Sequence, residues 1–413
     1  MKTDLVDSFK NSSDGKIAED ILRACVHCGF CNATCPTYQI IGDENDGPRG
    51  RIYLIKQMLE GKPVSDSTQL HLDRCLTCRN CETTCPSGVQ YSTLLDIGRK
   101  EIEARSPRSL KEKATRKLLR SVLPYRNRFG PLLNIGRVFK PILPAKIKSK
   151  MPRRVAKGSI PIAEHKRRML VLDGCVQPAL SPDINATTAR VLHKLGISLI
   201  TQKKAGCCGA VSQHLSAEAE ALLFMKNNID AWWPEIESGA EAIVMTASGC
   251  GAMVKDYAHH LRDDAEYAEK AQRVSALCKD ISEIIADEDL SALSISSAKS
   301  STKKNTEKGA EKISWHPPCT LQHGQKVNGV VEKILTDCGY ELLAVNDQHL
   351  CCGSAGTYSI LQPVISQQLQ ANKINNLQAN KPDMIVTGNI GCQTHLQEVS
   401  DVPVIHWIHL LDK

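Results

Sequence analysis

The sequence predicts a multidomain protein in which an all-α domain is followed by two related α/β domains. Three observations predict this fold class. The 413 residues are too many for one ordinary core. Eight of the eighteen cysteines fall between Cys25 and Cys85, and the other ten fall between Cys175 and Cys392. Short apolar runs that end in Gly or Cys alternate with helical stretches only in the second region, which is the α/β pattern.

Cysteine spacing and local composition divide the chain into five segments. We expect an α-helical domain, a basic connector, a first α/β domain, a Ser/Lys-rich linker and a second α/β domain. Their expected ranges are 1–105, 106–167, 168–292, 293–312 and 313–413.

Two copies of a C-x2-C-x2-C-x3-C-P run carry the strongest chemical signal, at Cys25, Cys28, Cys31 and Cys35 and again at Cys75, Cys78, Cys81 and Cys85. One such loop presents three thiolates to one four-iron cube, and the fourth cysteine ligates the other cluster in two-cluster ferredoxins. We therefore predict two 4Fe-4S clusters: cluster 1 on Cys25, Cys28, Cys31 and Cys85, and cluster 2 on Cys75, Cys78, Cys81 and Cys35. Zinc is the alternative, but zinc ribbons do not place a third cysteine three residues on.

The residues around these runs have helical periodicity. Apolar residues spaced by three and four predict helices over 17–24, 51–61 and 92–104. No convincing strand precedes residue 106, so we expect an all-α, two-cluster ferredoxin domain.

The connector is strongly basic. The chain has a formal net charge of +7, but residues 106–168 contain nineteen Lys or Arg and two acidic residues. Seven prolines interrupt residues 107–161. We favour a solvated connector, with contact to anionic lipid as the second interpretation. Nucleic-acid binding is the least favoured, because no recognised motif accompanies the charge, and we expect no nucleic-acid partner.

The C-terminal region contains an internal duplication. The first set of cysteines is Cys175, Cys207, Cys208 and Cys250, and the second is Cys319, Cys351, Cys352 and Cys392. The sets are offset by 144, 144, 144 and 142 residues. The apolar runs RRMLVLDGC, GISLIT, EAIVMTASGC, ELLAV and DMIVTGNIGC predict strands in two copies of one α/β unit.

Each repeated unit offers four thiols to one site. The adjacent cysteines must lie on a turn, for which the following glycine is suited. Loops at the carboxyl ends of parallel strands are where open α/β folds place ligands. We predict a further iron–sulfur or zinc site in each unit, with reduced thiols as the alternative. Cys278 and Cys338 are expected to be small buried residues, and His316, His323 and His395 are expected to be structural rather than ligands.

The first twenty residues are polar, and no stretch reaches the eighteen apolar residues of a membrane span. Clustered cysteines in a reducing compartment bind metal or do redox chemistry more often than they form disulfides. We therefore expect a cytoplasmic protein.

The order of two ferredoxin runs and two CCG units resembles a family of redox subunits. It includes the heterodisulfide reductases, the third subunit of anaerobic glycerol-3-phosphate dehydrogenase and the lactate-utilisation proteins. More narrowly, ILRACVHCGFCNATCPTYQ, DGPRGRIYLIKQ, HLCCGSAGTY and NIGCQTHL are similar to the glycolate oxidase iron–sulfur subunits of bacteria. The similarity covers nearly the whole chain and weakens in the connector and the linker.

This resemblance implies an electron-transfer subunit of a glycolate oxidase complex. Partner subunits that bind FAD would oxidise glycolate to glyoxylate, and this chain would pass the electrons toward a quinone-linked acceptor at the inner face of the cytoplasmic membrane. The chain has no G-x-G-x-x-G after a strand, so the flavin is expected on the partners. The alternatives are a subunit of another 2-hydroxy acid or glycerol-3-phosphate dehydrogenase, or a CCG-type thiol–disulfide or quinone reductase.

One departure from the wider family concerns the end of each CCG unit. Heterodisulfide reductases have C-x-x-C there, and their unit is thought to hold a non-cubane cluster on five cysteines. In this chain the last position is Met253 or His395. Four cysteines per unit remain, so the resemblance does not extend to a five-cysteine cluster.

Overall fold

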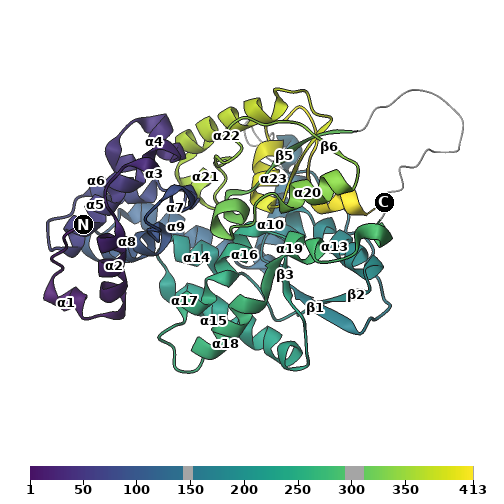
Figure 1. Cartoon of the computed structure of the whole chain (residues 1–413), viewed down its shortest axis with the longest axis horizontal. Coiled ribbons are helices and arrows are strands. Elements are labelled where there is room, and N and C mark those ends of the chain that lie inside the picture. The colour runs from purple at the N-terminus through teal and green to yellow at the C-terminus, as the bar shows by residue number, and fades with distance from the viewer. Residues whose placement is uncertain (143–151, 294–310, 413) are drawn as a thin grey trace, which may run out of the picture.

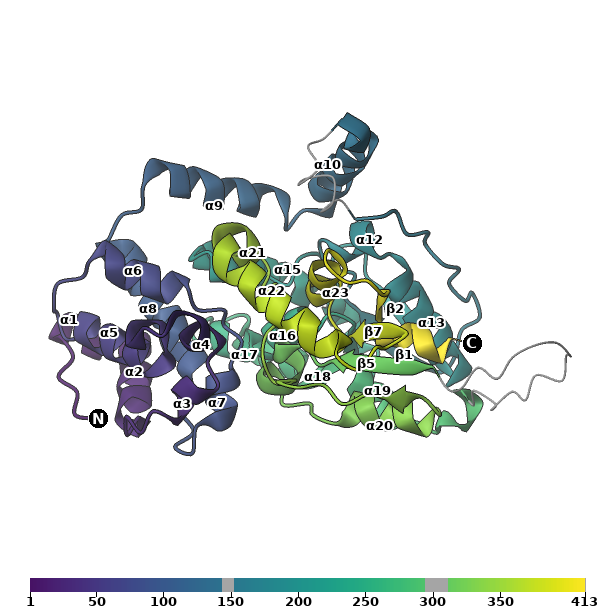
Figure 2. The same cartoon turned by 90° about the horizontal axis from the view of Figure 1, so that it is seen from above.

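The computed structural model describes residues 1–142, 152–293 and 311–412. Nearly all of the expected linker, and residues 143–151 of the connector, lie outside the described residues. The N-terminal helices lie at one end of the molecule and two parallel sheets lie at the other (Figure 1). The first connector helix, α9 (Leu110–Val122), runs along one side between them (Figure 2).

The N-terminal region folds into short helices around the cysteine loops. The predicted helices 17–24 and 92–104 lie within α2 and α8, and the prediction 51–61 matches α5 but runs two residues past its end. The apolar faces of the three helices meet in one core that includes Leu22, Ile55 and Leu94. Pro36 and Pro48 occupy first helical positions, where a missing N–H costs nothing. The elements are α1 (Asp7–Lys10), α2 (Ser13–Ala24), α3 (Phe30–Ala33), α4 (Pro36–Ile41), η1 (Glu44–Asp46), α5 (Pro48–Leu59), α6 (Asp66–Asp73), α7 (Asn80–Thr84) and α8 (Tyr91–Arg105).

The connector contains α9 (Leu110–Val122), α10 (Arg126–Val138) and η2 (Lys140–Ile142). A capping box begins α9, since the Ser109 side chain accepts from the Glu112 N–H and Glu112 accepts in return. Helix α10 projects from the body of the molecule in Figure 2.

Among the described residues, the strands form two four-stranded parallel sheets with the orders β2-β1-β3-β4 and β6-β5-β7-β8. The identical topology is what the duplicated cysteine sets predict. The strands are β1 (Arg167–Val171), β2 (Ile197–Thr201), β3 (Ile243–Met245), β4 (Cys278–Asp280), β5 (Lys312–His316), β6 (Glu341–Leu342), β7 (Met384–Thr387) and β8 (Val404–His406).

The five predicted strands are present, but β4, β5 and β8 were missed. Strand β5 is hidden in the sequence because Ser314 and His316 interrupt its apolar pattern. Ser314 is fully buried and donates to the Leu377 carbonyl at 2.7 Å, so its polarity is satisfied inside the core. Cys278 is buried on β4, as expected. Cys338 is only half-buried, because it follows α20 at the surface, and that expectation was wrong.

Helices connect and cover both sheets. The first sheet is accompanied by α12 (Gln177–Leu180), α13 (Asp183–Lys194), α14 (Ala210–His214), α15 (Glu218–Glu237), α16 (Ser248–Lys255), α17 (Tyr257–His260), α18 (Ala268–Leu277), α19 (Ile281–Ala286) and η3 (Leu290–Leu293). The second is accompanied by η4 (Thr320–Gly324), α20 (Val330–Asp337), α21 (Tyr358–Leu361), α22 (Pro363–Gln378), α23 (Ile390–Gln397) and η5 (Trp407–Leu411).

The two α/β units share a core. One apolar cluster contains Ile184 and Val244 from the first unit and Trp315 and Trp407 from the second. Helix α13 of the first unit corresponds to α20 of the second, and α19 corresponds to η5. Helix α13 contacts η5, and α19 contacts α20, so the same contact is made in both directions between the units. Such reciprocal contacts are produced by a twofold relation between the units.

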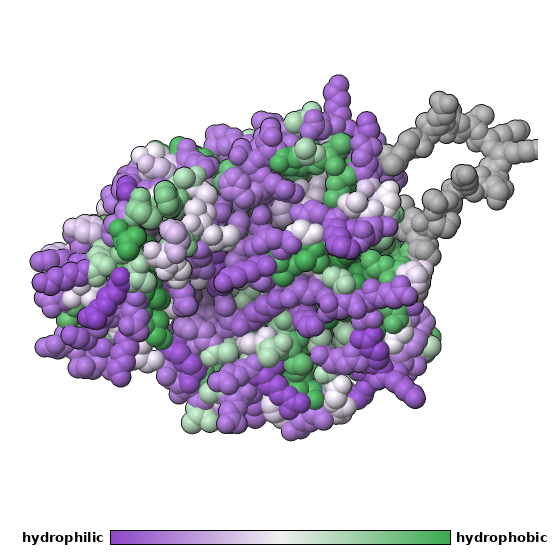
Figure 3. All heavy atoms as spheres, in the orientation of Figure 1, coloured by the Kyte–Doolittle hydropathy of each residue, from purple (hydrophilic) through white to green (hydrophobic). Residues whose placement is uncertain are grey.

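The outer surface in Figure 3 is mostly hydrophilic, with separate apolar patches. No helix within the described ranges is long and apolar enough to cross a bilayer.

Candidate metal centres

The two N-terminal cysteine loops have the same backbone conformation. His27 and Gly29 in the first loop have φ of 57° and 87°, and Thr77 and Arg79 in the second have φ of 55° and 60°. A residue in the left-handed backbone conformation at each of these two positions curves the loop around the cysteine side chains. Glycine takes this conformation without strain. At Gly29 a Cβ would also lie 2.6 Å from Nη1 of Arg49.

The eight N-terminal cysteines line two adjacent cavities. The first is lined by Cys25, Cys28 and Cys31 of the first run together with Cys85 of the second. The other is lined by Cys75, Cys78 and Cys81 together with Cys35 of the first run. The last cysteine of each run thus faces the other run's cavity, and Cys81 borders both.

The cavities differ in exposure. Cys28 is exposed at the mouth of the first cavity, next to Val26 and Phe30, which are 67% and 60% exposed. Cys78 and Cys81 of the second are buried. Burial, together with the neighbouring Cys25 and Cys28, raises the pKa of Cys31 to about 11. Crowded buried thiols form thiolates only beside a positive centre, so this donor set fits a thiophilic metal cluster.

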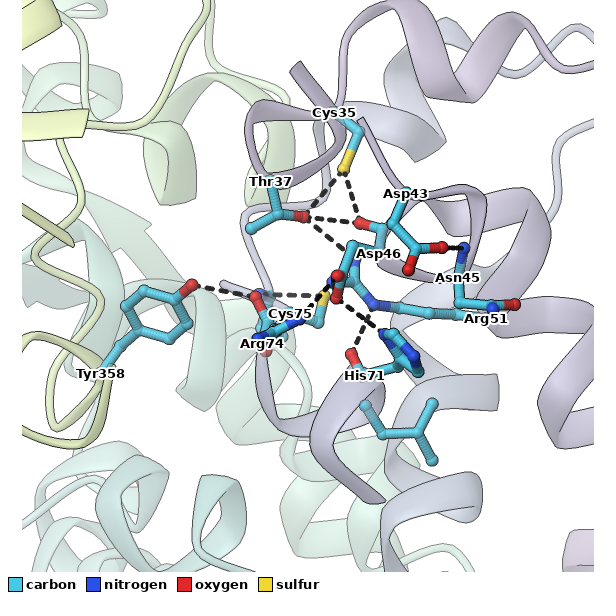
Figure 4. Close-up of polar contacts among 12 residues, drawn as sticks. Cys35, Thr37, Asp43, Asn45, Asp46, Arg51, His71, Arg74, Cys75 and Tyr358 are labelled. Atoms are coloured by element: carbon cyan, nitrogen blue, oxygen red, sulfur yellow. Dashed lines mark hydrogen bonds and ion pairs between the residues drawn. The ribbon is translucent and has the colours of Figure 1, made fainter. Parts of the chain in front are cut away.

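A buried polar network lies beside the second cavity (Figure 4). Asp46 is fully buried, and its carboxylate oxygens lie 3.4 Å from Arg51, 2.8 Å from Arg74 and 3.1 Å from Nδ1 of His71. Arg51 donates to Thr37 at 3.1 Å, and the Thr37 hydroxyl lies 3.2 Å from Sγ of Cys35. A guanidinium group is therefore held one side chain away from a predicted cluster ligand.

The charge of Arg51 is stabilised by its surroundings. Burial alone lowers its pKa, but Cys75, Tyr91, Cys35 and Asp46 raise it above its ordinary value. Arg51 therefore stays protonated in this site. It adds positive charge beside groups that become negative when they bind iron.

The loop of the second run is also held by α8. Arg99 donates to the Leu72 and Cys75 carbonyls, each at 2.9 Å, and to the Thr77 hydroxyl at 3.1 Å. These bonds fix the backbone around Cys75 and so preorganise its sulfur.

The second run also packs on the second α/β unit. Cys78 and Leu76 share an apolar cluster with Cys351, Tyr358 and Leu369. Burial and the nearby Cys319 raise the pKa of Cys78 well above its ordinary value. The Tyr358 hydroxyl donates to the Arg74 carbonyl at 3.0 Å. This unit therefore covers one side of the second cysteine loop.

Arg79 joins the same loop to the first α/β unit through an ion pair with Asp256. Arg79 takes the place that Gly29 has in the first run, and so adds a charge to the second loop. Asp256 carries the opposite charge and pairs with it. The buried difference between the two cavities comes instead from Arg51.

In the first α/β unit the four cysteines meet after three strands. The thiols lie next to one another in the order Cys175, Cys207, Cys208 and Cys250. The neighbouring thiols of Cys207 and Cys250 lower the pKa of Cys208 well below its ordinary value. Gly209, with φ of 94°, makes the turn and donates to Sγ of Cys207 at 3.4 Å.

The second unit repeats this geometry. Sγ of Cys319 lies 3.8 Å from Sγ of Cys351, and the N–H of Gly353 donates to Cys351 at 3.4 Å. Asn389 lies at hydrogen-bond distance from Cys392, at 3.5 Å. The loops at the carboxyl ends of β5, β6 and β7 therefore meet where the sequence predicted.

Two of the three histidines near this unit have structural contacts. His323 lies 3.1 Å from the Thr83 hydroxyl and 3.0 Å from the His349 carbonyl, so it joins α7 to this unit. The His395 ring contacts Ser366 and Gln370.

Comparisons with known proteins match this arrangement. The 4Fe-4S dicluster domain family matches residues 21–89, and the cysteine-rich CCG domain family matches 169–255 and 313–397. The chain is 53% identical to the glycolate oxidase iron–sulfur subunit of Escherichia coli K12, over 100% of this chain and 99% of that protein. The chain belongs to the glycolate oxidase iron–sulfur subunit family.

More distant relatives match all or part of the chain. The probable glycolate oxidase iron–sulfur subunit of Bacillus subtilis 168 is 28% identical over 93% of this chain and 90% of its own. Lactate utilization protein A of Oceanobacillus iheyensis is 25% identical over 58% of this chain and 93% of its own. These matches agree with the family resemblance found in the motifs.

Proposed function

We propose that this chain is the iron–sulfur electron-transfer subunit of a glycolate oxidase complex. The observation that carries the proposal is the pair of adjacent cysteine-lined cavities, of which the first has an exposed cysteine, Cys28, and the second has none. Membership of the family supports the same conclusion. Residues 1–105 then act as an all-α, two-cluster ferredoxin domain, and residues 168–292 and 313–413 act as CCG domains around it.

In this proposal the last cysteines of the two runs are exchanged between clusters. Cys85 completes cluster 1 and Cys35 completes cluster 2, which the lining of the two cavities supports. A 4Fe-4S cluster supplies one-electron redox chemistry when bound. The chain's own residues hold the thiolates, exclude water from the second site and set its charge through Arg51.

Cluster 1 is the end that exchanges electrons with a partner. Cys28 is exposed there, and Val26, Phe30 and Tyr53 (47% exposed) surround it with apolar surface. Electron transfer between proteins requires a close approach, and exposed aromatic and aliphatic residues are typical of docking surfaces. The partner is a flavin-binding subunit that oxidises glycolate to glyoxylate, and the final acceptor is quinone-linked.

The ligand exchange predicts a specific result for two single variants. In anaerobically purified protein, Cys35→Ser should lose the buried cluster and Cys85→Ser the exposed one. Each should contain about four irons instead of about eight. The reduced EPR signal left in Cys35→Ser should respond to an added water-soluble dysprosium complex, and the signal left in Cys85→Ser should not. The reverse pattern would contradict the assignment.

The complex itself is tested by co-purification. A tagged chain expressed with its flavoprotein partners should elute with FAD, and glycolate should then reduce the clusters. The proposal would be wrong if the wild-type protein elutes alone and its clusters stay oxidised with glycolate. Reduction by lactate or glycerol 3-phosphate through another flavoprotein would then assign the chain to that dehydrogenase complex.

Helix α10 supports a peripheral contact with an anionic membrane. Its exposed residues include the apolar side chains of Leu132, Ile135 and Val138, at 52%, 54% and 74% exposure, beside polar ones such as Arg128 and Asn134. Arg126 on the same helix is turned to the first CCG domain, where it pairs with Asp173. An amphipathic cationic helix with a free apolar face is suited to the interface of an anionic bilayer.

A further inference from the structure

A histidine lies among the cysteines of the second CCG domain without any polar partner. His316 ends β5 and is 1% exposed. Among the described residues, neither of its ring nitrogens has a hydrogen-bond partner. Burying an imidazole without a hydrogen-bond partner is unfavourable, so another partner is expected.

The same ring faces two thiols. One nitrogen of His316 and Sγ of Cys352 and Cys392 all lie within 4.8 Å of one another, and the two cysteines are 1% and 3% exposed. Neutral imidazole and thiolate are the donors that zinc prefers.

The first CCG domain has no counterpart to this group. Leu172 lies three residues before Cys175, as His316 lies three residues before Cys319. Leu172 is buried at 4% exposure and packs in the core of its own unit. The duplicated units therefore differ in one donor at an equivalent position, which the shared cysteine spacing does not reveal.

We propose that the second CCG domain holds a zinc ion on His316, Cys352 and Cys392, with Cys351 as the fourth ligand. Cys351 is the neighbour whose thiol contacts that of Cys352. Tetrahedral zinc with bonds of about 2.3 Å holds sulfur ligands about 3.8 Å apart, so His316, Cys352 and Cys392 close by about 1 Å or less on binding, while Cys351 turns toward them from outside this group of three. A four-iron cube spreads its ligands over four irons and needs a wider arrangement.

The charge of this site is balanced within the domain. Three thiolates and one divalent ion leave a single negative charge, which a buried position must compensate. Lys373 is 2% exposed and close to Cys351 and Cys352, and its Nζ donates to the Asp347 carbonyl at 2.7 Å. Because zinc has no redox chemistry, the site stabilises the domain that covers cluster 2 and carries no electrons itself.

The test is metal analysis of the full-length, anaerobically purified chain. Wild type should contain stoichiometric zinc in addition to its iron and sulfide. His316→Leu, which copies Leu172, should lose about one zinc per chain while iron, sulfide and the reduced EPR spectrum stay unchanged. The matched control is His406→Gln, because His406 is equally buried but is bonded to the Thr246 carbonyl at 2.9 Å; it should keep its zinc.

A second variant keeps the proposal testable if His316→Leu does not fold. His316→Cys should retain zinc. After substitution with Co(II), its visible spectrum should change from the pattern of three sulfurs and one nitrogen to that of four sulfurs. Zinc-free wild-type protein, or full zinc content in His316→Leu, would overturn the proposal. Loss of iron and sulfide instead of zinc in His316→Leu would also overturn it, by showing that this site holds a cluster. None of these outcomes depends on the electron-transfer function, which the N-terminal iron content tests separately.

Discussion

Replacing Arg51 tests whether a buried charge sets the potential of cluster 2. Successive contacts of 3.1 Å and 3.2 Å through Thr37 place a guanidinium nitrogen within about 6 Å of Sγ of Cys35. At an effective dielectric constant of about 20, one charge at that distance is worth about 3 kcal/mol, or on the order of 100 mV for one electron. Asp46 opposes part of this effect. We therefore expect Arg51→Met to lower the potential of cluster 2 by about 50–100 mV, because a positive charge favours the reduced, more negative cluster.

The assay is an EPR-monitored redox titration of both clusters. Arg49→Met is the matched control, since Arg49 lies beside cluster 1 but is 37% exposed and paired with Glu44. Solvent screens that pair, so its potential shift should be below about 20 mV. Arg51→Lys keeps the charge and should stay within about 30 mV of wild type. Removing one partner of a buried ion pair costs about 3–5 kcal/mol, so Arg51→Met should also melt earlier and be titrated in the cold. If Arg51→Met retains both clusters and both potentials stay within about 20 mV of wild type, the reasoning is wrong.

Three further predictions concern pH, backbone strain and the membrane. Burial raises the pKa of Asp280 from 3.8 to about 6 in the folded state, so its contribution to stability, about 2–3 kcal/mol, is lost as the pH rises from about 4 to 6. Asp280→Asn keeps the helix cap and should raise the melting midpoint more at pH 8 than at pH 5; an equal effect at both would contradict this. Gly353→Ala should lower the free energy of unfolding by at least about 2 kcal/mol in urea titrations, because φ is +89° and the new Cβ would lie 2.6 Å from a carbonyl oxygen. Gly329→Ala, at φ +73° with open space around it, should cost about 1 kcal/mol. Ile135→Asp with Val138→Asp should abolish co-sedimentation with phosphatidylserine vesicles and leave the cluster content unchanged; undiminished binding would exclude α10 as the contact.

Much of the fold was predictable because its signals are local. The spacing of each cysteine run depends on about ten consecutive residues, and the loop conformation around Gly29 follows from them. The five strands recognised in the sequence are short and apolar, and three of them lead into a Gly-Cys step. Strand β5 was missed because Ser314 breaks its apolar pattern. The Ser314 hydroxyl can be buried because it donates to the carbonyl of Leu377, which lies 63 residues away in the sequence, and no local pattern shows that contact.

The site was partly predictable for the same reason. Sequence spacing named the eight N-terminal cysteines and the two sets of four, and the structure gathers each of these groups together. Sequence spacing did not reveal that Arg51 lies beside the second cavity. In the sequence it looks like any other arginine on a helix, and only the structure shows that it is buried. His316 was expected to be structural. Only the tertiary structure, in which β5 pairs with β7, shows that its ring is buried without a polar partner among the described residues.

By itself, the sequence determined the cysteine chemistry, the duplication and the α/β class, because spacing and periodicity act over a few residues or repeat at a constant offset. Only the tertiary structure decided which charges are buried, that the second CCG domain covers Cys78, and that His316 meets Cys352 and Cys392. These features depend on the packing of segments tens to hundreds of residues apart. Burial there is a collective result of many contacts, which no single stretch of sequence encodes.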